Sequence, residues 1–350
     1  MAIEGCGASA FIIWKDETCS EINEEGTRSN FRRLVDEIGD WGFLAVGGVE
    51  AEVDTTTREE KKKIIRMAVE EANGRVPVFC GVHSDSLWEQ IEMAKEGKEL
   101  GANGVLFHPC SLFPGYTAPW NEEYIIEHLK RVDREVNLPI VLFGSPPGGS
   151  VQGHNTVMPE TYKKAAQKIK NIQAWKVSAG GNLTSFFKAY EIMKDTQVNT
   201  VPAGSSEPQL FITHAMGWAR GVVSGGSNAA AIWEIEMMQK AIAGKINEAK
   251  ALASRLKQIF DVVYGILPGL AFPGFVERYK LHAWLAGLLP EMRMRYPRLP
   301  RPKVEVELLY QGMKKSGLYG KKILIEAEKK VRAYDRAKLL KVKQKPPVLK

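Results

Sequence analysis

Short apolar runs alternate with amphipathic segments along the first two thirds of the chain. Eight of these runs are rich in Val, Ile, Leu and Phe and are short enough to be buried β-strands. They are ASAFIIW (8–14), FLAVGG (43–48), VPVFCGV (76–82), GVLFHP (104–109), LPIVLF (138–143), IQAWK (172–176), VNTVPAG (198–204) and GVVSGG (221–226). The pattern predicts eight strands with a helix between each strand and the next.

The segments between the runs have helical periodicity. Four apolar residues between the first and second runs recur at the spacing of one helical face, namely Phe31, Leu34, Val35 and Ile38. Between the second and third runs, Thr57 and Glu60 have the spacing of a capping box, and Asn73-Gly74 is a typical helix end. We therefore expect a helix over REEKKKIIRMAVEEA (58–72).

This alternation indicates a parallel sheet, because two successive parallel strands need a crossover connection. Closure of eight such units into a (β/α)₈ TIM barrel is the most economical topology. An open doubly wound sheet is the alternative. A dinucleotide-binding sheet of that kind would carry G-x-G-x-x-G after its first strand, whereas GCGASA (5–10) precedes the first expected strand.

The β-type runs stop near residue 229, and helical periodicity continues beyond it. Five apolar residues there share one face, namely Leu252, Leu256, Ile259, Phe260 and Val263. We therefore expect three parts. They are a barrel over 1–228, a C-terminal helical region over 229–318 and a basic helical tail over 319–350.

Composition narrows the class of protein. Of the 350 residues, 44% are hydrophobic and 25% charged, which is typical of a globular protein and excludes a wholly disordered chain. No apolar stretch approaches the roughly 18 residues of a membrane span, and the N-terminus lacks a signal-peptide pattern, so we expect a cytoplasmic protein. The four cysteines lack disulfide or metal-ligand spacing, which predicts reduced thiols and no metal site; they are Cys6, Cys19, Cys80 and Cys110.

The net charge of +7 is concentrated at the C-terminal end. Residues 321–350 hold eleven Lys or Arg and three acidic residues, so this tail carries +8 and the rest of the chain −1. Nucleic-acid binding needs a broad basic surface, which this distribution does not indicate. A solvated helix is the simpler interpretation, and a tail that contacts nucleic acid or anionic surfaces is the alternative.

Lys176 ends the sixth run, directly after Trp175. Lysine is rarely buried without a partner, so two interpretations stay open: a strand-end lysine paired with a carboxylate, or a reactive amine. In a barrel, the carboxyl ends of the strands form the active face. An amine that is partly desolvated there is more often neutral, and it can attack a ketone to form an imine. Trp175 should point outward, toward the helices.

Five segments give the chain a family resemblance when they are taken in order. They are GRVPVFCGV (74–82), GANGVLFHP (101–109), LPIVLFGSPPG (138–148), IQAWKVSAGG (172–181) and GWARGVVSGGSN (217–228). From about Gly7 to Gly317 the chain resembles the family of dihydrodipicolinate synthase and N-acetylneuraminate lyase, which are class I aldolase-type barrels. The resemblance implies that Lys176 forms a Schiff base with a 2-oxo acid, without metal or organic cofactor. It also implies a homo-oligomer, either a dimer or a tetramer.

The chain departs from the family pattern at several positions. The family carries a proton-shuttling tyrosine at the end of the fifth strand, where this chain has Phe143. A family loop Gly-Thr-Thr-Gly-Glu aligns with residues 48–52, so that Val49 and Glu50 replace both threonines. The arginine after the proline is replaced by Gly148 or Gly149, and the tyrosine pair after the fourth strand by residues 110–112. These changes argue against synthesis of dihydrodipicolinate itself.

General acid–base catalysis typically raises a reaction rate by roughly 10²- to 10⁴-fold, so another group is expected to replace the missing tyrosine. Glu50 is the expected catalytic partner of Lys176, either as a base or as an ion-pair partner. The expected substrate-binding residues lie on the same face and are Gly48, Val49, His108, Phe143, Ser145, Gly204 and Val223.

The sequence therefore predicts a Schiff-base lyase of the aldolase or hydratase-aldolase type. Its substrate is a 2-oxo acid or a related carbonyl compound, with an apolar aldehyde as the preferred partner because hydroxyl residues are lost from the site. One alternative is a catalytically inactive relative that binds a small carbonyl or acid ligand as a sensor or scaffold. The other is an interaction protein that acts through the basic tail.

Overall fold

The computed structural model describes residues 3–84, 86–108, 122–147, 156–204, 207–265 and 274–347. Eight strands form one parallel sheet in the order β7-β6-β5-β4-β3-β2-β1-β8. Their bounds are β1 Gly5–Ser9, β2 Gly42–Val46, β3 Val78–Val82, β4 Gly104–Phe107, β5 Ile140–Gly144, β6 Ile172–Val177, β7 Asn199–Pro202 and β8 Gly221–Ser224. An isolated parallel bridge between Ala203 and Val223 joins the two outer strands. The chain is therefore a (β/α)₈ barrel, as the alternation predicts.

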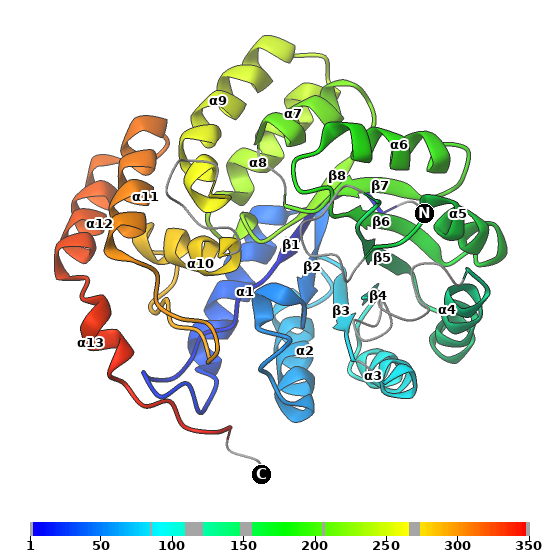
Figure 1. The fold of residues 1–350 in the computed structure, drawn as a ribbon, viewed down its shortest axis with the longest axis horizontal. Helices are drawn as coiled ribbons and strands as arrows, with labels where there is room; N and C mark the ends of the chain where they lie inside the picture. Colours follow the sequence, from blue (N-terminus) through cyan, green and yellow to red (C-terminus); the bar gives the residue numbers. More distant parts are fainter. Residues whose placement is uncertain are drawn as a thin grey trace.

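Helices follow the strands and cover the outside of the barrel (Figure 1). They are α1 Glu24–Ile38, α2 Arg58–Ala72, α3 Leu87–Glu99, α4 Glu122–Val136, α5 Pro159–Lys168, α6 Leu183–Met193, α7 Glu207–Ala215 and α8 Ser227–Ile242. The apolar face expected between the first two strands is buried on α1. The Thr57–Glu60 capping box is formed at the start of α2, and Asn73 ends this helix in the left-handed conformation.

The first predicted strand is wrong in its position. We expected a strand over 8–14, but β1 is Gly5–Ser9 and lies inside the GCGASA segment. The apolar run that follows is buried as a loop, because side chains take its backbone donors. The amide of Phe11 donates to Asn228 Oδ1 and the amide of Ile13 to Thr27 Oγ1. Thr27 lies on α1 and Asn228 far along the chain on α8, and periodicity shows neither contact.

A small apolar cluster fills the barrel interior, and large and small side chains alternate within it. Phe43 and Phe79 pack with ring centroids 4.8 Å apart. A Cβ on Gly7 would lie 2.4 Å from Phe43 Cζ, and one on Gly104 would lie 2.1 Å from Phe79 Cε1. Glycine at these two inward positions therefore makes room for the rings. The packed interior leaves chemistry to the strand ends, as in other barrels of this kind.

In the described residues beyond the barrel there are five further helices. They are α9 Ile246–Val263, α10 Phe275–Leu285, α11 Lys303–Ser316, α12 Lys321–Ala333 and α13 Arg336–Leu340. The five apolar residues expected to share one face are all buried on α9. In Figure 1, α9, α11 and α12 lie on the side of the barrel that carries α1 and α8. None of the helices in the described ranges has the length and apolar character that crossing a membrane requires.

Candidate active site

Lys176 points into the barrel near the carboxyl end of β6. Ala174, two residues earlier, belongs to the interior cluster, whereas Trp175 packs outside against Tyr162. Period-two alternation along the strand therefore places Lys176 on the inner face. Only 5% of Lys176 is exposed, so its amine is held inside the mouth of the barrel.

The surroundings of Lys176 disfavour its charged form. Burial lowers the pKa of Lys176, and the negative charge of Glu50 opposes this shift in part. The amine lies 4.9 Å from the centroid of the Phe143 ring, which is also buried. Within the part of the chain that the structure describes, no ion pair or hydrogen bond engages Lys176 Nζ. The strand-end ion pair, which was the structural interpretation of this lysine, is therefore absent from these residues.

Glu50 lies on a short 3₁₀ turn, Val49–Ala51, that follows β2. It is 5% exposed, and its Oε2 accepts a hydrogen bond from Ser9 Oγ at the end of β1. A Cβ on Gly225 would lie 2.8 Å from Glu50 Cγ, so the side chain packs over the end of β8. Glu50 thus enters the barrel mouth without pairing directly with Lys176, and it can influence the amine through its charge.

His108 follows β4 and is buried beside Phe143, with ring centroids 4.7 Å apart. Burial holds the pKa of His108 well below its ordinary value, and the charges of His83 and Lys176 act in the same direction. The imidazole is therefore neutral at pH 7. Its Nε2 is buried and has no hydrogen-bond partner among the described residues. A neutral ring there can hydrogen-bond a substrate but supplies little acid.

The structure brings the other predicted residues to the same face. Gly48 is buried, and a Cβ there would lie 3.7 Å from Ser9 Oγ. Ser145 is 1% exposed, and its carbonyl accepts from the amide of Val157. Gly204 follows β7, and Val223 belongs to the interior cluster of the barrel. Val49 differs from the others, because it is only partly buried and packs against the core of the C-terminal helices.

Two tyrosines that the sequence pattern does not single out also reach this face. Tyr279 lies on α10, and its hydroxyl donates to the carbonyl of Gly204 over 3.0 Å. Tyr264 caps the end of α9, and its hydroxyl is hydrogen-bonded to that of Tyr279. Both come from the helices after the barrel. No local motif marks them, because the contact depends on how α9 and α10 dock.

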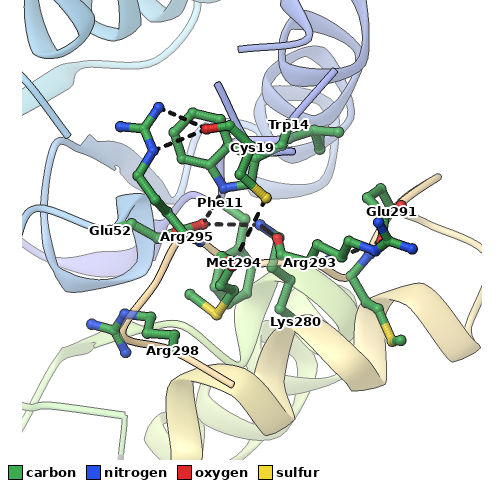
Figure 2. A network of polar contacts seen from close by, with 12 residues as sticks. Phe11, Trp14, Cys19, Glu52, Lys280, Glu291, Arg293, Met294, Arg295 and Arg298 are labelled. Atoms are coloured by element: carbon green, nitrogen blue, oxygen red, sulfur yellow. Dashed lines mark hydrogen bonds and ion pairs between the residues drawn. The ribbon is translucent and has the colours of Figure 1, made fainter. Parts of the chain in front are cut away.

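Glu52, at the end of the Glu50 turn, is the centre of a buried polar network (Figure 2). Its Oε1 accepts from Lys280 Nζ over 3.1 Å and from Trp14 Nε1 over 3.0 Å, and its Oε2 accepts from the amide of Arg295 over 2.6 Å. The side chains of Glu52 and Lys280 are both 0% exposed. Because Lys280 follows Tyr279 on α10, the ion pair ties that helix to the turn that carries Glu50.

The sequence of this chain is similar to those of known proteins with the same kind of barrel. The family model of the dihydrodipicolinate synthetase family matches residues 9–300. The chain belongs to the dihydrodipicolinate synthetase family. A 4-hydroxy-tetrahydrodipicolinate synthase from Methanocaldococcus jannaschii is 32% identical over 70% of this chain and 78% of its own. One from Persephonella marina is 27% identical over 83% and 93%.

Solved structures in the dihydrodipicolinate synthetase family show the same fold. A structure described as the first monomeric dihydrodipicolinate synthase variant has a TM-score of 0.76, is 24% identical and covers 91% of this chain and 98% of its own. A prophage protein of the family from E. coli K12, solved in complex with pyruvate, has a TM-score of 0.74 and is 20% identical. It covers 89% of this chain and 98% of its own.

Several family positions lie outside the described residues. They are the segment 110–112, where the family has a tyrosine pair, and Gly148 and Gly149. Cys6, Cys19 and Cys80 are buried free thiols, and Cys110 is also outside the described ranges. Among the residues that are described, no three His, Cys, Asp or Glu side chains are placed to hold a metal ion.

A cavity of about 700 Å³ lies elsewhere, between the segment after α10 and the C-terminal tail. Arg295, Arg298 and Arg301 on its wall pair with Glu60, Asp54 and Glu305. Barrel enzymes react at the carboxyl ends of their strands, and none of the described residues that line this cavity belongs to a strand. The face that holds Lys176, and not this cavity, is therefore the candidate active site.

Proposed function

We propose that this protein is a Schiff-base lyase in which Lys176 attacks the carbonyl carbon of a 2-oxo acid. The observation that supports this most is the inward, buried amine of Lys176, whose pKa is lowered by burial and which has no ion-pair partner among the described residues. A neutral amine adds to the carbonyl, and loss of water gives an imine. The protonated imine then accepts electrons from a neighbouring C–H or C–C bond.

Pyruvate or a close relative is the proposed first substrate, because a family member from E. coli K12 is described in complex with pyruvate. The second substrate in our proposal is an apolar aldehyde. Phe143 stands where the family pattern has a tyrosine, and its buried ring gives the β5 side of the mouth an apolar surface. His108 Nε2, which is buried beside this ring, is the polar group we assign to substrate orientation. We also propose a dimer or tetramer as the working assembly.

Reductive trapping tests the proposal. The protein is incubated with a panel of 2-oxo acids and cyanoborohydride, digested and mapped by mass spectrometry, with Lys176→Met as the control. We expect an adduct on the IQAWK peptide (172–176) for one or more 2-oxo acids, lost in the control. Binding of an oxo acid without an adduct would contradict the proposal and support the inactive sensor or scaffold that the missing tyrosine first suggested.

A further inference from the structure

We propose that the hydroxyl pair of Tyr264 and Tyr279 carries the proton in this site and takes the place of a hydroxyl on β5. Tyr264 is the member that exchanges a proton with the substrate, and Tyr279 positions it. The inference rests on the proposed function, because it needs an imine on Lys176. It assigns a catalytic task to the helices after the barrel.

The hydrogen bonds of the pair fix its polarity. The carbonyl of Gly204 can only accept, so the single hydroxyl proton of Tyr279 is directed to that carbonyl. In the bond between the two hydroxyls, Tyr264 therefore donates to the oxygen of Tyr279. Tyr279 is 2% exposed, whereas Tyr264 is partly exposed. The pair thus has a buried member held by the backbone and a second member that is less buried.

The pair lies near the strand that carries the lysine. Gly204 follows β7, which pairs with β6, and the amide of Ala203 donates to the carbonyl of Val177. A Cβ on Gly204 would lie 2.9 Å from the hydroxyl of Tyr279 and 3.4 Å from that of Tyr264. Both hydroxyls therefore lie beside Gly204, one residue beyond the Ala203 that is bonded to the residue after Lys176.

The same pair adjoins the carboxylate of the site. A Cβ on Gly225, at the end of β8, would lie 2.8 Å from Glu50 Oε1 and 3.0 Å from Tyr279 Cδ2. The carboxylate and the phenol ring therefore meet over one glycine, which leaves both of them room at the mouth. The Glu52–Lys280 ion pair fixes this arrangement, because Glu52 ends the Glu50 turn and Lys280 follows Tyr279 (Figure 2).

One tyrosine, Tyr264, accounts for both proton transfers of the proposed reaction. Addition of the Lys176 amine forms an N–C bond, and its proton moves to the former carbonyl oxygen. Tyr264 turns its proton from Tyr279 to that oxygen, which leaves as water while the nitrogen lone pair forms the C=N bond of the cationic imine. The Tyr279 hydroxyl then turns its proton from the Gly204 carbonyl to the resulting phenolate, which next removes a proton from the adjacent carbon. The C–H electron pair forms the C=C bond of the enamine, and Tyr264 is neutral again.

Exchange of the methyl protons of pyruvate in D₂O measures this last step directly, by NMR, without knowledge of the aldehyde. Cyanoborohydride trapping at long times measures the imine itself. In Tyr264→Phe we expect exchange to fall by roughly 10²- to 10⁴-fold, while the final yield of adduct on Lys176 stays that of the unmodified protein. Tyr279→Phe should reduce exchange less, because Tyr264 keeps its own proton.

Tyr162→Phe is the matched control. Its hydroxyl also donates to a backbone carbonyl, that of Phe143 over 2.8 Å, but it is fully buried on the outside of the barrel. This variant should keep both proton exchange and adduct trapping. A loss of either in this variant would show that removal of any buried hydroxyl disturbs the site.

Exchange at the unmodified rate in Tyr264→Phe would overturn the inference, as would trapping without exchange in the unmodified protein. Loss of the final adduct yield in Tyr264→Phe would assign the pair a structural role instead. Absence of any adduct in the unmodified protein would overturn the proposed function first, and the inference with it.

Discussion

The mouth of the barrel has two unlike walls on either side of the Lys176 amine. The wall from β4 and β5 presents the Phe143 ring and a neutral His108. The wall from β1, β2, β7 and β8 carries Ser9, Glu50 and the Tyr264–Tyr279 pair, all linked by short polar contacts or shared packing. Desolvation by one wall favours a neutral amine, and the other wall holds the groups that can move protons.

In the proposed mechanism, the two walls separate activation of the nucleophile from proton transfer. The apolar wall is built from neighbouring strand ends, whereas the polar wall joins β1, the turn after β2 and two helices from the end of the chain. Changes to the apolar wall should therefore alter the reactivity of the amine. Changes to the polar wall should alter the proton transfers that follow addition of the amine.

Removal of the amine between the walls has the largest expected effect. Lys176→Met should abolish the reducible adduct and all methyl-proton exchange, because both need the nucleophile. The variant should fold, since a buried apolar side chain replaces an amine whose charged form is disfavoured by burial. Mass mapping and thermal unfolding measure the two results. An adduct that persists on the variant would show that another amine is the nucleophile.

The anchor of the polar wall should matter most for stability. Lys280→Met leaves the buried Glu52 carboxylate without its cation, and the free energy of unfolding should fall by about 3–5 kcal/mol. Lys15→Met, which breaks the exposed Lys15–Glu21 pair, is the control and should cost less than about 1 kcal/mol. Chemical denaturation compares the two. Equal losses would mean that Glu52 does not depend on Lys280.

Ser9→Ala removes one hydrogen-bond donor from the polar wall. The Ser9 hydroxyl donates to the buried Glu50 carboxylate, so its loss should cost roughly 1–3 kcal/mol of unfolding free energy. Ser254→Ala removes an exposed hydroxyl that donates to the carbonyl of Lys250 and should change stability by less than about 0.5 kcal/mol. Denaturation curves decide this, and indistinguishable variants would argue against a structural link between β1 and Glu50.

The smallest expected effect comes from making the apolar wall polar. In the Tyr264→Phe background, Phe143→Tyr should recover exchange by on the order of tenfold, because it supplies a phenol beside the amine. Phe143→Leu in the same background lacks the hydroxyl and should recover nothing. NMR exchange with pyruvate measures both. Equal recovery by the two variants would mean that ring size, rather than the hydroxyl, limits the reaction.

Much of the fold follows from periodicity. The parallel barrel, the buried face of α1 and the capping box of α2 are all present as the pattern predicts. The first strand is misplaced because Phe11 and Ile13 look like strand residues, yet Asn228 and Thr27 bind their amides. Hydrophobicity reports burial at such positions, whereas strand pairing depends on partners that lie far away in sequence.

Barrel topology explains how some of the candidate site residues come together. Lys176, Glu50 and His108 stand at strand ends, so barrel topology alone brings them together. Tyr264 and Tyr279 reach this face only because α9 and α10 dock on the barrel. Ser9 reaches it because β1 starts earlier than its apolar run suggests, so that Ser9 is the last residue of the strand. Placement by strand ends is predictable, whereas placement by helix docking depends on tertiary packing.

The pH dependence of imine formation tests the central claim most directly. The rate of Lys176 adduct formation with pyruvate is measured under single-turnover trapping across the alkaline range, with Phe143→Tyr beside the unmodified protein. Because burial lowers the pKa of Lys176 below 10.5, the neutral amine and the trapping rate should reach half their maximum below that pH. A midpoint at or above pH 10.5 would show that the amine stays charged, and would contradict a desolvated nucleophile.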